Sequence, residues 1–272
     1  RNEVEMVSSS CKKRFGKIML EKMNIVHQEE IVPRIFAMDL QGEMVSQMKA
    51  GQFLHIRVPD DTKLLRRPIS ISEIDKERKI CRIIYRIEGA GTEIFSKLQK
   101  GFQLDVMGPQ GNGFDLSELD NHSKVLLVGG GIGVPPLLEV AKQLHERGVE
   151  ITTVLGFATK DAVILEDELA KYGQVYVTTD DGSHGIKGNV SVVINEIDTE
   201  FDAIYSCGAP GMMKYINQTF YDHPRAYLSL ESRMACGMGA CYACVLKVPD
   251  SETVSQRVCE DGPVFKTGTV IL

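Results

Sequence analysis

Four cysteines near the C-terminus have a spacing that suits an iron–sulfur cluster. Cys236, Cys241 and Cys244 follow the pattern C-x4-C-x2-C, and Cys259 comes after fourteen further residues. Four thiolates at this spacing can hold a [2Fe–2S] cluster, two on each iron. Thiolate is a soft ligand that suits iron, and the sulfide core needs a short loop wrapped closely around it. We therefore expect these four cysteines to be the metal ligands.

Small residues fill the gaps between the first three cysteines. They are Gly237, Gly239, Ala240 and Ala243. Glycine permits turns with positive φ, and small side chains let backbone N–H groups approach the sulfur atoms. This composition favours a loop wrapped around a cofactor.

Three other interpretations of the cysteines remain open. Cysteine can pack as a small hydrophobic residue, but three within nine residues of glycine and alanine make a poor apolar core. Structural zinc sites usually combine two separated C-x2-C pairs, and only one such pair is present here. Disulfides need an oxidising compartment, and seven cysteines, an odd number, fit a reducing cytoplasm better. We rank the cluster first, zinc second and disulfides last.

The composition is that of a globular protein. The chain has 272 residues, of which 43% are hydrophobic and 25% charged, a length that predicts two domains or slightly more. A net charge of −6 and a pI near 5.6 argue against nucleic acid or an anionic membrane as the main partner. No apolar run approaches the roughly 18–20 residues of a transmembrane helix.

The beginning of the chain is polar and irregular. Arg1–Lys17 lacks the apolar region of a secretory signal. We interpret residues 1–20 as a native extension or a remnant of expression, leave them out of the fold prediction, and expect a cytoplasmic protein.

Short strands dominate residues 21–118. Segments rich in Ile, Val, Phe or Tyr are separated by glycine-containing turns, which predicts a small antiparallel barrel. The expected strands are Met23–Gln28, Ile31–Asp39, Phe53–Val58, Ile69–Ile74, Lys79–Ile87 and Gln103–Met107. One helix is expected over Thr92–Leu98, with Thr92 as its N-cap.

Two segments of this barrel suit a phosphate-bearing cofactor. In Arg66–Ser70, Arg67 offers a guanidinium fork to a pyrophosphate, Pro68 stiffens the turn, and the Ser70 hydroxyl could bond a flavin ring edge. The second segment runs from Tyr85-Arg86 to a glycine turn that opens the expected helix, whose free N–H groups suit phosphate. Each segment alone could be only a solvated strand end or a capped turn. The cofactor-binding candidates are Arg67, Pro68, Ile69, Ser70, Ile84, Tyr85, Arg86, Gly91 and Thr92.

In this order, the two segments resemble the flavin-binding barrel of the ferredoxin-reductase-like family. That resemblance implies FAD as the cofactor, with the Arg-x-x-Ser motif and the Gly-Thr pair at the helix start as its contacts. Ile69 stands where many relatives have tyrosine, and Tyr85 is expected to supply an aromatic contact instead. Residues Met107–Phe114, with three glycines and a proline, predict a domain linker or a loop under the flavin.

Residues 119–225 alternate between strands and helices, which predicts a parallel sheet. The strand that begins at Lys124 runs into the glycine turn Gly129–Gly133, followed by Pro135-Pro136 and a helix over Leu137–Glu146. A strand, glycine turn and helix present N–H groups to a pyrophosphate, although the spacing departs from G-x-G-x-x-G. Further strands are expected over Glu150–Gly156, Gln174–Thr179, Ala203–Cys207 and Ala226–Leu230, with helices over Ala162–Lys171, Val190–Glu196 and Gly211–Phe220.

The carboxyl ends of these strands should hold the nucleotide. Cys207 alone would pass for a buried small residue, but the segment Cys207–Pro210 matches the Cys-Gly-x-Pro turn that lies under the nicotinamide in the resembled family. Asp180-Asp181 would repel a 2′-phosphate, which favours NAD over NADP. The nucleotide-binding candidates are Gly130, Gly131, Gly133, Cys207, Gly208 and Pro210.

Residues 226–272 form the expected cluster module, with strands over Ala243–Val248 and Thr269–Leu272 beside the cluster. About forty residues are too few for a complete ferredoxin domain, so the module should lean on the nucleotide domain or on a partner. The predicted fold class is mixed β and α/β: an antiparallel FAD barrel, a parallel-sheet nicotinamide domain and a small C-terminal [2Fe–2S] module.

This order of modules resembles the electron-transfer subunits of class B dihydroorotate dehydrogenase. The resemblance implies a role in pyrimidine biosynthesis: an FMN-containing catalytic subunit oxidises dihydroorotate, and electrons pass through the cluster and FAD to NAD+. It also implies a heterotetramer of two copies of each subunit. We name no catalytic residue, because no His/Asp/Ser or Cys/His constellation in the sequence requires one.

Two alternative functions remain. One is a flavin and iron–sulfur subunit of an NAD(P)H:ferredoxin oxidoreductase or sulfhydrogenase, which has the same cofactors. The other is a non-enzymatic iron–sulfur scaffold, which should have degraded flavin and nicotinamide motifs, whereas both motifs look intact here.

Overall fold

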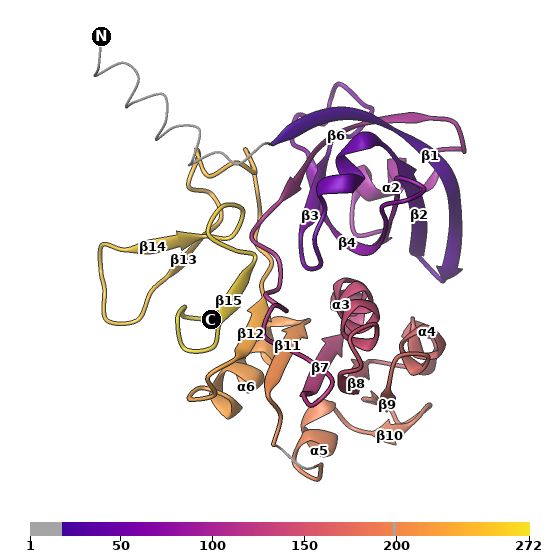
Figure 1. Ribbon diagram of the computed structural model, residues 1–272. Coiled ribbons are helices and arrows are strands. Elements are labelled where there is room, and N and C mark those ends of the chain that lie inside the picture. The colour runs from indigo at the N-terminus through magenta and orange to yellow at the C-terminus, as the bar shows by residue number, and fades with distance from the viewer. Residues whose placement is uncertain (1–17, 198–199) are drawn as a thin grey trace.

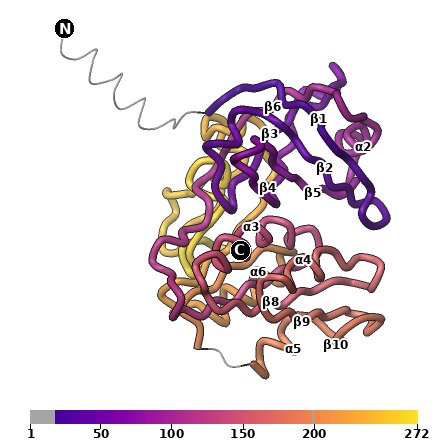
Figure 2. The backbone as a smooth tube through the Cα atoms, turned by 45° about the vertical axis from the view of Figure 1, so that its right-hand side comes forward, coloured from indigo at the N-terminus to yellow at the C-terminus, as the bar shows by residue number. Residues whose placement is uncertain are grey.

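The computed structural model describes residues 18–197 and 200–272 and shows a barrel, a parallel sheet and a C-terminal module (Figure 1). The module lies alongside both larger bodies (Figure 2). The expected N-terminal extension falls outside the described residues except for positions 18–20, two of which already belong to the first strand. Among the described residues, no helix is long and apolar enough to cross a membrane.

Six antiparallel strands close the predicted barrel in the order β1-β2-β5-β4-β3-β6. Their bounds are β1 Met19–Val32, β2 Ile35–Gln41, β3 Phe53–Ile56, β4 Arg67–Asp75, β5 Ile80–Arg86 and β6 Gln103–Gln110. The first strand is longer than expected because β1 pairs with β6 through its first half and with β2 through its second half. It turns at Pro33-Arg34, where Arg34 has φ of 66°, and not at the expected break near Glu29.

Two short helices accompany the barrel. The 3-10 helix η1, Glu43–Gln47, was not expected, and α2 covers Ala90–Ser96. The helix α2 begins two residues before the predicted start, with Gly89 as its N-cap. The Thr92 hydroxyl still stabilises this end, because it accepts hydrogen bonds from the N–H groups of Glu88 and Gly89 at 3.0 and 3.3 Å.

The second body is a seven-stranded sheet in the order β10-β9-β8-β7-β11-β12-β15. All neighbours are parallel except β12 and β15. The strands are β7 Lys124–Gly130, β8 Glu150–Phe157, β9 Gln174–Thr179, β10 Ile186–Lys187, β11 Ala203–Cys207, β12 Ala226–Ser229 and β15 Val264–Lys266. The helices are η2 Gly131–Gly133, α3 Pro135–His145, η3 Lys160–Ala162, α4 Glu166–Ala170, α5 Val190–Ile194 and α6 Pro210–Thr219. Leu165, with φ of 62°, interrupts the single helix expected over Ala162–Lys171.

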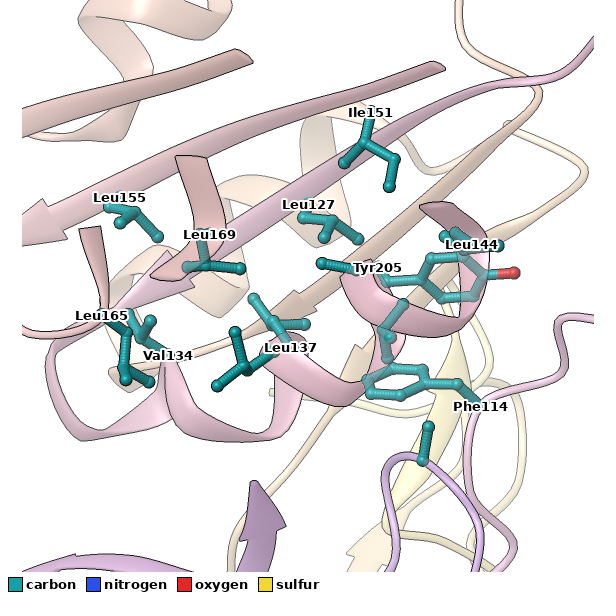
Figure 3. Packing of buried hydrophobic residues seen from close by; sticks show 14 of the residues in the cluster. Phe114, Leu127, Val134, Leu137, Leu144, Ile151, Leu155, Leu165, Leu169 and Tyr205 are labelled. Carbon is teal, nitrogen blue, oxygen red and sulfur yellow. The ribbon is translucent and has the colours of Figure 1, made fainter. Parts of the chain in front are cut away.

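Alternate strand residues supply two apolar cores, one on each face of this sheet. Leu127, Ile151 and Tyr205 pack with α3 and α4 (Figure 3). Leu126 and Ile204 are buried on the other face with residues of α5 and α6. Layers of helix on both faces are what a parallel sheet of apolar strands requires.

The C-terminal module shares the second of these cores. A hairpin of β13, Val245–Lys247, and β14, Ser255–Arg257, leads to β15, which pairs with β12. The strand predicted over Thr269–Leu272 is wrong, because the chain has already turned out of the sheet at Gly268, which has φ of 77°. The module therefore packs against the seven-stranded sheet, one of the two supports expected for it.

The barrel and the sheet are joined by polar and apolar contacts at α3, which lies between them (Figure 1). The buried Glu139 carboxylate accepts a hydrogen bond from the Ile74 N–H at 2.8 Å, and Lys142 Nζ donates to the Ile74 carbonyl at 3.2 Å. Ile35 and Ile84 of the barrel belong to the same apolar core as α3. This clamp on the backbone of one residue of β4 helps to set the position of the barrel relative to the sheet.

Glu139 affects stability in two ways: its carboxylate accepts a hydrogen bond from Ile74, and burial of its ionised form is costly. Two substitutions should separate these effects. Glu139→Ala leaves the buried Ile74 N–H unpaired and should lower the free energy of unfolding by about 1–3 kcal/mol. Glu139→Gln keeps an acceptor and should cost less. Burial raises the pKa of the Glu139 carboxyl, so burying its ionised form costs stability increasingly as pH rises above the ordinary carboxyl range.

Urea unfolding of the protein at several pH values would check this. The stability difference between Glu139→Gln and wild type should move in favour of glutamine as pH rises. Equal losses for alanine and glutamine would contradict the clamp.

Candidate cofactor sites

A cavity of about 550 Å³ opens where the barrel, the sheet and the start of the cluster loop meet. All nine barrel residues predicted to bind the cofactor line it, although they come from β4, β5 and α2. The structure therefore brings together the two segments that were separate and individually weak in sequence. The lining residues are Phe53, Arg67–Ser70, Ile84–Arg86, Glu88–Thr92, Ile132, Ser229–Met234 and Pro263.

Arg66 and Arg67, at the start of β4, have different roles: one holds the backbone, and the other lines the cavity. Arg66 donates to the Asp105 carboxylate at 2.7 Å and to the Asp105 carbonyl at 2.9 Å, so it ties the loop to β6. Arg67 lines the cavity, and among the described residues its guanidinium donates only to the backbone oxygens of Leu65 and Arg66. A Cβ atom at Gly91 would lie 2.7 Å from Arg67 Nε. The guanidinium thus packs directly on the first turn of α2, which makes one anion-binding corner from both segments.

The ring of Tyr85 lies elsewhere than expected. It stacks on Phe36 with centroids 5.9 Å apart and meets Phe95 edge-on at 6.1 Å, and its hydroxyl donates to Gln28 Oε1 at 3.0 Å. Burial raises the pKa of the Tyr85 hydroxyl. Both ring contacts are therefore within the barrel core, and Tyr85 forms part of the cavity wall without a free aromatic face. The rest of the wall comes from Ile69, Ser70, Ile84 and Arg86.

Sequence reasoning missed the wall contributed by Ser229–Met234. This segment follows β12, so it lies at the carboxyl end of a parallel strand, the edge at which such sheets bind ligands. The position of this segment after a predicted strand could have identified it in the sequence, but its residues were assigned to the cysteine loop that follows. The Glu231 side chain is exposed in the cavity. Desolvation by the surrounding protein, together with the negative charge of nearby Glu88, raises the pKa of its carboxyl.

The predicted nucleotide-binding glycines meet at the centre of the sheet. Strands β7 and β11 are neighbours, with Gly129 paired to Cys207, and the chain order reverses between them. A Cβ atom at Gly133 would lie 2.6 Å from backbone atoms of Cys207 and Gly208. The turns after the two strands are therefore in backbone contact, at the position where doubly wound sheets bind nucleotides.

The remaining nucleotide candidates surround this contact. Gly130 and Gly208 both pack on Met212 of α6, and Gly131 has φ of 52°. Pro210 opens α6 at its first turn. Burial raises the pKa of the Cys207 thiol, so Cys207 is a neutral group at this edge. The acidic residue Asp181 follows β9 and accepts hydrogen bonds from the N–H and hydroxyl of Ser183.

The four predicted cluster ligands gather as two pairs of thiols. Cys244 Sγ and Cys259 Sγ are 3.3 Å apart, and Cys236 Sγ accepts a hydrogen bond from the Cys241 N–H at 3.4 Å. Across the described ranges, no three cysteine, histidine or carboxylate side chains converge as a single metal ion would require. Two pairs suit a two-iron cluster better than zinc.

Backbone groups of the loop point at these sulfur atoms, as the small residues predicted. The N–H groups of Met238 and Gly239 approach Cys236 Sγ at 3.4 Å and Cys259 Sγ at 3.2 Å. Gly237 and Gly239 have φ of 68° and 74°. The backbone hydrogen bond with Cys236 and another with Ala243 lower the pKa of Cys241 to about 7, whereas burial raises that of Cys259 to about 12.

Arg257 braces the loop and was not singled out in sequence. Its guanidinium makes a bidentate pair with Asp261, donates to the Gly239 carbonyl at 2.9 Å, and lies 5.3 Å from the ring centroid of Tyr242. One side chain thus fixes the middle and the far side of the loop. The donor set, the N–H groups and this brace fit a [2Fe–2S] cluster.

Phe53 lies between the two cofactor regions. It lines the 550 Å³ cavity, and it belongs to the same buried apolar group as Cys244 and Cys259. The cavity and the buried thiol pair therefore border the same apolar core.

A methyl group at Gly91 should weaken FAD binding through Arg67. The Gly91→Ala side chain would displace the flexible guanidinium at little cost in stability, but the lost charge-assisted contact should raise the Kd for FAD about tenfold or more. Gly211→Ala is the control, because a Cβ atom there meets no described atom within 4 Å and Gly211 does not line the cavity. Fluorescence titration of FAD into the flavin-free protein measures both. Equal affinities for the two variants would disprove a role for the Arg67–Gly91 corner.

A methyl group at Gly133 should instead affect the nicotinamide nucleotide. The Gly133→Ala side chain meets backbone that cannot rotate away, so it should separate the two glycine turns and raise the Kd for NADH about tenfold or more. The control is Gly211→Ala at the start of α6, where nothing lies within 4 Å. Stopped-flow reduction of bound FAD by NADH gives this constant. Unchanged NADH binding in Gly133→Ala would place the nucleotide elsewhere.

Three family models match the three parts of the chain. The oxidoreductase FAD-binding domain matches residues 20–114, and the oxidoreductase NAD-binding domain matches residues 127–218. The iron–sulfur cluster binding domain of dihydroorotate dehydrogenase B matches residues 231–271. Together they support FAD, NAD and an iron–sulfur cluster as the cofactors of this chain.

Whole-chain similarities agree with these matches. The chain is 79% identical to a dihydroorotate dehydrogenase B (NAD(+)) electron transfer subunit of Streptococcus pneumoniae, over 94% of this chain and all of that protein. It is 64% identical to the subunit of the same name from Streptococcus mutans, over 94% and 99% of the two chains. A solved NADH-dependent reduced ferredoxin-NADP oxidoreductase aligns with a TM-score of 0.81 at 32% identity, over 92% and 90% of the chains. The chain belongs to the family of dihydroorotate dehydrogenase B electron transfer subunits.

Proposed function

We propose that this chain passes electrons from a dihydroorotate-oxidising, FMN-containing subunit to NAD+, as part of pyrimidine biosynthesis in the cytoplasm. The observation that carries the proposal is that Phe53, which lines the flavin cavity, belongs to the apolar core that contains the buried Cys244 and Cys259. Family membership supplies the substrate, because the relatives are named for dihydroorotate dehydrogenase B.

The proposed ligand sets follow the geometry. FAD would be held by Arg67, Pro68, Ile69, Ser70, Ile84, Tyr85, Arg86, Gly91 and Thr92, which line one cavity. NAD would be held by Gly130, Gly131, Gly133, Cys207, Gly208 and Pro210 at the switch point of the sheet. The cluster would be held by Cys236, Cys241, Cys244 and Cys259. When bound, an iron–sulfur cluster carries single electrons, nicotinamide takes up a hydride, and a flavin exchanges either.

The protein's own residues bind and orient these groups. Arg67 and the first turn of α2 place a positive corner for a pyrophosphate, and the glycine turns let a nucleotide approach the backbone closely. Phe53, Leu230 and Pro263 form an apolar part of the cavity wall. We assign no general acid or base, since electron and hydride transfer depend on placement and potential.

The exposed half of the cluster loop supports docking of the partner there. Cys241 is exposed, as are the large side chains Tyr242, Val245 and Val254 around the hairpin, whereas Cys244 and Cys259 are buried. Apolar side chains beside an exposed ligand suit a protein surface that delivers electrons at that point. By similarity to the family, we propose two copies of each subunit in the complex.

The runner-up is a flavin and iron–sulfur subunit of an NAD(P)H:ferredoxin oxidoreductase. Its support is the solved NADH-dependent oxidoreductase, which covers nearly the same length at 32% identity. The 79% identity to a dihydroorotate dehydrogenase B subunit favours the first function.

The deciding experiment is anaerobic. The chain is purified with its catalytic partner, dihydroorotate is added, and NADH formation and the flavin spectrum are followed. Wild type should form NADH steadily. Cys241→Ala should lose this activity by a hundredfold or more, on the order expected when a required cofactor is lost, while its FAD is still reduced by NADH. Failure with dihydroorotate but rapid exchange with ferredoxin would establish the runner-up.

A further inference from the structure

Two buried polar side chains of the barrel press on the cluster loop outside the flavin cavity. His55 on β3 is 0% exposed and Gln110 at the end of β6 is 3% exposed. A Cβ atom at Gly237 would lie 2.3 Å from His55 Nδ1 and 3.1 Å from Gln110 Oε1. Both side chains therefore touch the loop at the residue that follows Cys236.

The strand pattern explains why they point there. Leu54 and Ile56 belong to the core inside the barrel, so Phe53 and His55 project outward, toward the C-terminal module. Gln110 of β6 lies opposite Phe53 of the neighbouring strand β3. Arg66 donates to the His55 carbonyl at 3.3 Å and helps to hold this part of β3 in place.

Within residues 18–197 and 200–272, neither side chain makes a hydrogen bond of acceptable geometry, although the nearby Arg66 backbone opposes the lowering of the His55 pKa. Both ring nitrogens of His55, and both the amide nitrogen and oxygen of Gln110, are buried and unpaired. Buried polar groups nearly always have partners because leaving them unpaired is costly. An apolar side chain of similar size would fill either position better unless another group is to be bound there.

The chemistry of the pair points to an acceptor-rich partner. Burial, together with the charge of Arg66, lowers the pKa of His55 to about 4, so the ring is neutral near pH 7 and carries one N–H donor. The Gln110 amide adds two donor hydrogens. The neighbouring loop already directs the N–H groups of Met238 and Gly239 at thiol sulfur atoms.

We propose that His55 and Gln110 donate N–H hydrogen bonds to the sulfur atoms of the bound [2Fe–2S] cluster and thereby raise its reduction potential. Reduction adds a negative charge to the cluster, and donors to its sulfurs stabilise the more negative state. The barrel that binds FAD would then also set how readily the cluster accepts an electron. This inference rests on the cysteine ligand set proposed above.

The direct test is pulsed EPR of the dithionite-reduced holoprotein labelled with 15N-histidine. A nitrogen hydrogen-bonded to a cluster sulfur gives a resolved 15N coupling, which should be present in wild type and in His122→Leu, where an exposed histidine is removed. The coupling should disappear in His55→Leu. Wild-type protein with a [2Fe–2S] signal but no histidine coupling would overturn the proposal for His55, whatever the folding of the variants.

Redox titration gives the second readout. His55→Leu and Gln110→Leu together should make reduction of the cluster about tenfold less favourable, a shift of 59 mV for one electron, with the FAD potential unchanged. His55→Gln, which keeps a donor, should restore part of the shift. The cluster-free double variant should be at least as stable as the cluster-free wild type, because unpaired polar groups are gone.

The outcomes separate the possible failures. An unchanged cluster potential in the His55→Leu/Gln110→Leu double variant would reject the proposal. Clear destabilisation of the cluster-free double variant would also reject it, because it would indicate a packing role for the two side chains. Absence of any [2Fe–2S] signal from reconstituted wild type would instead refute the proposed ligand set.

Discussion

Burial of half of a metal site in an apolar core is the constraint on which the rest of this structure depends. Cys244 and Cys259 lie in the core that also contains Leu228 and Phe265 of the sheet and Phe53 of the barrel. A module of about forty residues cannot build such a core alone. Strand β15 therefore extends the nucleotide-binding sheet, and β3 covers the core from the barrel side. The cluster region is consequently assembled from all three parts of the chain.

Contacts at two places fix the barrel, and therefore its cavity, relative to the sheet. Phe114, at the end of the predicted linker, fixes the barrel from one side: its N–H donates to the Ala50 carbonyl at 2.9 Å, and its ring packs on Tyr205 with the ring centroids 5.2 Å apart. The contacts of Glu139 and Lys142 with Ile74 fix it from the other. Held at two places, the barrel presents its cavity both to the end of β12 and to the glycine turn at Ile132. Placement of this kind is the main contribution a protein makes to cofactor chemistry.

Local patterns in the sequence were enough to predict the barrel, the parallel sheet and the candidate sites. Spacing identified the cysteines, and the order of the motifs associated Arg67 with Gly91, which are in contact. The contacts of individual side chains could be seen only in the three-dimensional structure. Tyr85 alternates correctly for a barrel strand, yet only the positions of Phe36 and Phe95 show that its ring is enclosed. Phe53 and His55 look like ordinary strand residues, and their role arises from a loop almost two hundred residues away.

The polar contacts at the joint between the barrel and the sheet are made to the main chain of the barrel. Glu139 binds the N–H of Ile74, and Lys142 binds its carbonyl, so neither contact reads the identity of the residue at position 74. Apolar substitutions there can accumulate over evolutionary time while the two halves keep their alignment. The polar part of the joint is therefore independent of the side chain at position 74, whereas its apolar part depends on outward residues such as Ile35 of β2 and Ile84 of β5.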